Sequence, residues 1–94
     1  MEPDSLEEIR LNIDFIDQQI VQLLGERHFY VKQAAKYKTS TDDVKAPARV
    51  EAVITKVRIV AEQNDIDADM VETIYRTMID CFINSELKEL EKSQ

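Results

Sequence analysis

The sequence predicts an all-α protein, a three-helix chain whose first helix is much longer than the other two. Apolar residues recur every three or four positions through most of the 94 residues, which is the spacing of one helix face. Turn-forming residues are scarce, with one Gly and two Pro, so the helices must be few and long. A chain of this length supports one core, and we expect residues 1–94 to form a single domain.

The first helix is expected to begin at Asp4 or Ser5, either of which can cap it, and to end near Tyr37. It contains Gly25, at a cost of roughly 1 kcal/mol. At 1.5 Å per residue it is a rod about 50 Å long, whereas a domain of this size has a radius of gyration of only ~13 Å. Such a rod needs a second chain to cover its apolar face, so the length predicts a homodimer. The apolar face consists of Leu6, Ile9, Ile13, Ile16, Ile20 and Leu23.

The rest of the chain should form one loop and two helices. Residues 39–45 are polar and show no periodicity, so we expect a loop there. Pro47 suits the first turn of the second helix, Asn64 and Asp65 should end that helix, and Asp67 can cap the third. The expected core positions of the second helix are Val50, Val53, Ile54, Val57 and either Val60 or Ala61. Those of the third are Val71, Ile74, Tyr75, Met78, Ile79 and Phe82.

Composition excludes several classes of protein. The net charge of −7 argues against binding nucleic acid or anionic membranes, both of which call for a basic surface. No stretch approaches the roughly 20 apolar residues of a membrane span, and the first residues do not resemble a signal peptide. The single Cys81 excludes an internal disulfide and should be buried beside Ile79, Phe82 and Ile83. These features predict a cytoplasmic protein.

Arg27 occupies a position on the apolar face of the first helix. A buried guanidinium needs an anion, either a protein carboxylate such as that of Glu86 or a ligand. Arg10 lies 17 residues earlier, about 25 Å along the helix, but in an antiparallel pair it could approach Arg27 of the other chain. With Lys38 and Arg49, these cations would suit a small dicarboxylate.

Simpler interpretations remain open for each cation. Arg10 could be a surface residue paired with Asp14, Lys38 could be the end of a helix, and Arg49 could be solvated. His28, the only histidine, has no companions at metal-ligand spacing, so we expect no metal. The chain also lacks a Gly-rich phosphate loop and a Ser-His-Asp or Cys-His set, so we expect no cofactor and no nucleophile.

The order and spacing of Arg10, Arg27, Lys38 and Arg49 carry a resemblance to a known family. The matching segments are residues 9–17, 20–27, 30–38, 46–50, 61–64 and 82–88. In these segments the chain resembles the all-helical chorismate mutase family, and within it the isochorismate-pyruvate lyase branch. The resemblance implies an intertwined homodimer of three-helix chains with two shared sites and no cofactor. It also implies conversion of chorismate to prephenate, elimination of pyruvate from isochorismate to give salicylate, or both.

The resemblance also implies roles for five residues. Arg10 of the other chain and Arg27 would bind the two carboxylates of the substrate, and Arg49 would add positive charge on the carboxylate side. Lys38 would lie near the ether oxygen, with the following loop closing over the substrate. Glu86 falls opposite Lys38, where many bacterial members have glutamine; its carboxylate would repel charge on the ether oxygen, whereas its protonated form could donate a hydrogen bond.

Two further residues distinguish the branches of this family. Mutases specialised for chorismate commonly carry acidic residues around the start of the second helix, where this chain has Ala46 and Val50. That difference favours isochorismate. The alternative from another class is a non-catalytic helical dimer, a regulatory remnant of the family, which would have no need of four cations at matching positions.

Overall fold

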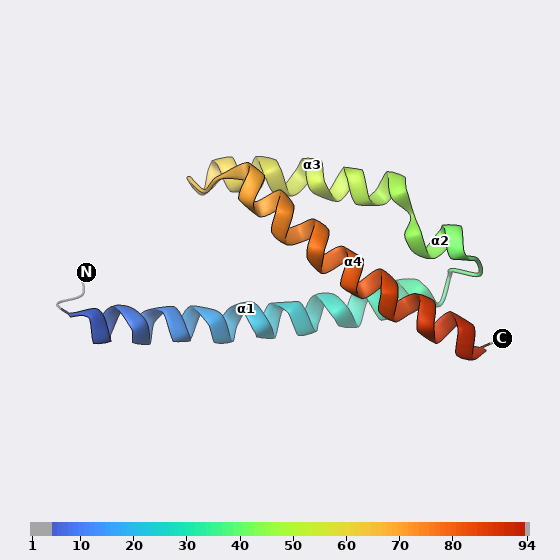
Figure 1. Ribbon diagram of the computed structural model, residues 1–94, viewed down its shortest axis with the longest axis horizontal. Coiled ribbons are helices and arrows are strands. Elements are labelled where there is room, and N and C mark those ends of the chain that lie inside the picture. The colour runs from blue at the N-terminus through green and yellow to red at the C-terminus, as the bar shows by residue number, and fades with distance from the viewer. Residues whose placement is uncertain (1–4, 94) are drawn as a thin grey trace. The chain divides into compact units, whose positions relative to one another are not determined.

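The computed structural model describes residues 5–93, leaving aside the side chain of Ser93, and this range contains four helices and no strand (Figure 1). They are α1 (Leu6–Ala35), α2 (Thr41–Lys45), α3 (Pro47–Gln63) and α4 (Ala68–Ser93). The prediction of an all-α fold is confirmed, with the long helices where we expected them. The chain divides after Ala34 into two compact units, each described separately below. That they act as one domain stays a prediction.

The first unit contains α1 up to Ala34, and this helix is capped as the sequence suggests. The Ser5 hydroxyl accepts a hydrogen bond from the Glu8 amide at 3.1 Å, while Asp4 lies outside the described residues. The helix ends at Ala35, two residues before the expected end. No side chain of α1 is buried, and the six residues of its apolar face are 41–62% exposed. The helix therefore offers a continuous apolar surface along most of its length.

The second unit begins with a correction, because residues 41–45 form a helix and not the expected loop. The Ser40 hydroxyl accepts a hydrogen bond from the Asp43 amide at 3.1 Å, as in a helix N-cap. The α2 helix packs on α4, and its Val44 is 4% exposed. A helix of five residues with one buried side chain is too short to show a helical period, which is why periodicity failed to identify it.

The α3 and α4 helices form an antiparallel hairpin (Figure 1). Pro47 opens α3 as expected, Asn64 and Asp65 follow its end, and the Asp67 carboxylate caps α4 by accepting from the Asp69 amide at 2.8 Å. Before α3, Ala46 adopts a left-handed conformation with φ of 36°. The expected helix boundaries of this hairpin are thus confirmed.

Core packing selects among the predicted apolar positions of the hairpin. Ile54, Ala61 and Ile79 are buried, so the α3 face continues through Ala61 and not through Val60, which is 51% exposed. Two expectations for α4 are wrong: Ile74 and Cys81 are both exposed. These two residues lie about two turns apart, on one edge of α4 outside the arc that packs on α3.

Ion pairs on the surface of the hairpin join α3 to α4. Arg76 donates two hydrogen bonds to the Glu51 carboxylate, at 2.9 and 2.8 Å, and a third to Glu72 at 2.8 Å. Arg58 donates to Glu72 at 2.7 Å and lies 3.0 Å from Asp69. The hydrogen bond from Arg76, reinforced by Arg58, holds the pKa of Glu72 below its usual value. Solvent screens each pair, but the bidentate geometry fixes how the two helices pair.

Candidate active site

Lys38 and Glu86 meet in the second unit, although 48 residues separate them in the sequence. The Lys38 Nζ donates a hydrogen bond to the Glu86 Oε2 at 3.2 Å. The two side chains are only 24% and 12% exposed, so both charges have lost much of their hydration. The structure therefore pairs directly the two residues that the resemblance places on either side of the ether oxygen, and their catalytic role stays a prediction.

Local structure explains how each member reaches this position. Lys38 follows the end of α1, where its amide donates to the Ala35 carbonyl at 3.0 Å. Glu86 lies one turn beyond Phe82 on α4 and continues the partly buried face of that helix, as the periodicity suggested. The Val44 anchor of α2 packs α2 on α4. A turn and two helices of one unit thus bring the ammonium to the carboxylate.

The other predicted cations are distributed over both units. Arg49 lies near the start of α3, in the same unit as Lys38, and is exposed. Arg10 and Arg27 both lie on α1, exposed and half-buried respectively. Because α1 is one continuous helix, the 17 residues between them span about 25 Å, too far for one small ligand. The gathering of these three arginines around Lys38 stays a prediction.

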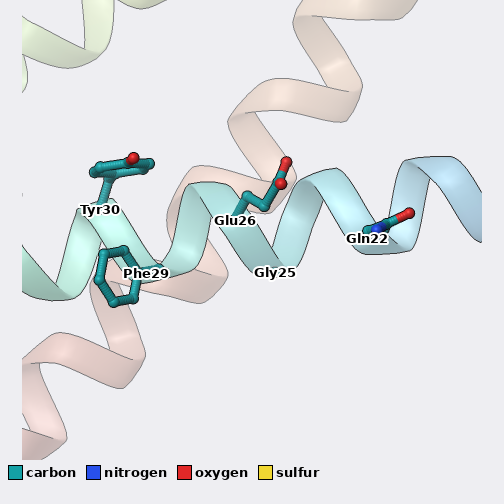
Figure 2. A pocket seen from close by; sticks show the side chains of 5 residues that line it. All are labelled: Gln22, Gly25, Glu26, Phe29 and Tyr30. Atoms are coloured by element: carbon teal, nitrogen blue, oxygen red, sulfur yellow. The ribbon is translucent and has the colours of Figure 1, made fainter.

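A shallow hollow lies on α1 (Figure 2). Gln22, Gly25, Glu26, Phe29 and Tyr30 line it, all from one stretch of the helix. The rings of Phe29 and Tyr30 meet edge to face, with centroids 5.3 Å apart. None of the four predicted cations lines the hollow, so it lacks the charge that a dicarboxylate needs.

Residues 5–93 offer neither a cluster of metal ligands nor a helix that could cross a membrane. This range holds no group of three or more His, Cys, Asp or Glu side chains arranged to bind a metal ion. No helix in the same range combines the length and apolar character needed to cross a bilayer. The cytoplasmic location stays a prediction.

A hydrogen-bonded turn that the helical periodicity does not predict follows Lys38. Thr39 donates to the Asp43 carboxylate from its amide, at 3.2 Å, and from its hydroxyl, at 3.4 Å. The signal was present, because Ser40 and Asp43 have the spacing of a capping box, with Asp in the place of the usual Glu or Gln. Without a helical period around it, this spacing alone did not predict a helix.

One family model and three known proteins match most of this chain. The family model for chorismate mutase type II matches residues 9–87. An isochorismate pyruvate lyase from Pseudomonas aeruginosa is 41% identical over 83 residues, which cover 88% of this chain and 82% of that protein. A chorismate mutase from Methanocaldococcus jannaschii is 26% identical over 92 residues, covering 97% and 93% of the two chains. A T-protein from Haemophilus influenzae is 32% identical over 74 residues, which cover 78% of this chain and 20% of that protein. Taken with the helical fold and the paired lysine and glutamate, these matches show that the chain belongs to the chorismate mutase type II family.

Proposed function

We propose that this enzyme of the chorismate mutase family eliminates pyruvate from isochorismate to give salicylate, and that it rearranges chorismate to prephenate as a second activity. The similarity to an isochorismate pyruvate lyase over most of both chains supports the first reaction. Ala46 and Val50 support it too, because neither offers a carboxylate around the start of α3. The match to a chorismate mutase over nearly the full length supports the second reaction.

Both reactions are pericyclic and need only a shaped, charged site. In the lyase reaction a hydrogen moves from the ring to the methylene carbon of the enolpyruvyl arm while the C–O bond breaks. Pyruvate leaves and the ring becomes aromatic. In the mutase reaction the same C–O bond breaks while a new C–C bond forms. The protein contributes by holding the arm over the ring and by stabilising charge on the ether oxygen.

The Lys38–Glu86 pair is the observation that carries this proposal. The Lys38 ammonium is partly withdrawn from water, and there a hydrogen bond to a developing oxyanion is worth more than in bulk solvent. Lys38 would donate to the ether oxygen once Glu86 releases it. Arg27 and Arg10 of the other chain would bind the substrate carboxylates, and Arg49 would add positive charge beside them.

An intertwined homodimer with shared sites is part of the same proposal. The exposed apolar face of α1 supports it, because residues that are 41–62% exposed along a 30-residue helix call for a partner surface. The separation of about 25 Å between Arg10 and Arg27 supports it as well, because one small ligand can contact both only if they come from different chains.

The substrate is tested by supplying isochorismate and chorismate separately and measuring salicylate, pyruvate and prephenate. We expect kcat/KM to be higher for isochorismate than for chorismate. Lys38→Ala should lower kcat about 10²–10³-fold in both reactions, as loss of a comparable donor does elsewhere. Lys56→Ala, which removes an exposed lysine from α3, is the matched control and should retain activity. Turnover of neither substrate by the unmodified protein would leave the non-catalytic dimer as the better description.

Shared sites are tested by mixing two inactive variants, Arg10→Ala and Lys38→Ala, under conditions that exchange subunits. If each site takes Arg10 from one chain and Lys38 from the other, half of the dimers are mixed and each of these has one intact site. About a quarter of the normal activity should then return. Sites built from a single chain would recover nothing, and a folded monomer in sedimentation would refute the dimer itself.

A further inference from the structure

We propose that Asp43 is a positioning residue for Lys38: its carboxylate fixes the turn from which the Lys38 side chain reaches Glu86. The inference rests on the proposed function and deepens it, since it concerns the residue that would donate a hydrogen bond to the ether oxygen. Asp43 lies on α2, only a short way along the chain from Lys38.

The carboxylate of Asp43 accepts two hydrogen bonds from the residue that follows Lys38. Its Oδ2 receives the Thr39 amide at 3.2 Å and the Thr39 hydroxyl at 3.4 Å. In return, the Asp43 amide donates to the Ser40 hydroxyl at 3.1 Å. The two ends of the turn are thus bonded to each other in both directions, in the manner of a capping box.

These bonds restrain both backbone dihedrals of Lys38. The Thr39 amide belongs to the peptide plane whose orientation is set by ψ of Lys38, so fixing that amide restrains ψ. The Lys38 amide, bonded to the Ala35 carbonyl at 3.0 Å, restrains φ in the same way. With two soft dihedrals per residue, restraining both fixes the direction in which the side chain leaves the backbone.

The other end of the turn is held by packing. Val44, the residue after Asp43, is 4% exposed, and α2 packs on α4, the helix that carries Glu86. Asp43 therefore links the backbone of Lys38 to α2. The α2 helix packs on α4, which carries Glu86, the hydrogen-bond partner of Lys38. The hydrogen bond from the Thr39 amide holds the pKa of Asp43 below its usual value, so the carboxylate that accepts this bond is present at neutral pH.

The test compares Asp43→Ala, Asp43→Asn and Asp42→Ala by steady-state kinetics well below the unfolding midpoint. We expect Asp43→Ala to lower kcat about fivefold, which is the change in an equilibrium constant that loss of a typical helix cap produces. KM should change less than kcat. Asp43→Asn keeps an acceptor oxygen and should restore kcat to within about twofold. Asp42→Ala removes the same charge from the same turn of α2 and should leave kcat unchanged.

A second measurement needs no substrate, so it separates this inference from the proposed function. Amide hydrogen exchange at Thr39 should be faster in Asp43→Ala than in the unmodified protein, and the NMR signal of the Lys38 ammonium should shift. If the protein turns over neither substrate but these changes occur, the positioning stands and the proposed function fails. Unchanged Thr39 exchange, or a lowered unfolding midpoint with unaltered kcat, would overturn the role of Asp43.

Discussion

Replacing Glu86 by glutamine is the sharpest test of the Lys38–Glu86 pair. In the substrate-free protein the Glu86 carboxylate binds the Lys38 ammonium at 3.2 Å, so a dianionic substrate must compete for that ammonium and approach a negative charge. Glu86→Gln removes the charge but keeps a group of similar size that can accept or donate a hydrogen bond. We expect substrates to bind more tightly and kcat not to fall.

The magnitude follows from the geometry of the pair. At 3.2 Å, two unit charges attract by about 1 kcal/mol in water and by about 5 kcal/mol at an effective dielectric constant of 20. The Lys38 and Glu86 side chains are 24% and 12% exposed, so their attraction lies between these two values. Part of it is offset by the desolvation of both charges. A net effect of about 2 kcal/mol is reasonable, which corresponds to a roughly 30-fold lower KM.

The assay is the initial rate of salicylate formation as a function of isochorismate concentration at neutral pH, with direct titration of a non-reactive cyclic dicarboxylate as a second measure. Glu91→Gln makes the same change of charge at an exposed position of α4 and should leave KM unaltered. A KM in Glu86→Gln that stays within twofold of the unmodified protein, or rises, would refute the idea that Glu86 competes with the substrate.

Two further predictions concern stability. Because the hydrogen bond from Arg76 lowers the pKa of Glu72, the stabilising effect of Glu72 is present above the usual value of 4.5 and is lost as the pH falls through the lower pKa of the folded state. Urea unfolding between about pH 5 and 3 should therefore depend less on pH in Glu72→Gln, whereas Glu62→Gln, on the exposed side of α3, should keep the original slope. Ala61 is 2% exposed, so Ala61→Leu should destabilise the fold by about 1–3 kcal/mol through overpacking. The urea midpoint measures this change, and a midpoint equal to that of the unmodified protein would show that the α3–α4 contact is loose at Ala61.

Helix boundaries could be predicted well because they depend on neighbouring residues. Ser5, Pro47 and Asp67 act within one turn of themselves, as caps or as a first helical residue, and each is found in the expected role. The error at α2 has the same origin, since a single buried side chain, that of Val44, gives no period to detect.

The sequence by itself determined the helical class and the long amphipathic α1, because both follow from spacing along the chain. Only the tertiary structure decided that Ala61 and not Val60 enters the core, that Cys81 is exposed, and that Glu86 binds Lys38. Each of these depends on how helices far apart in the sequence pack against one another. A helical period gives the face that is apolar, but the contact between two faces sets which side chains meet.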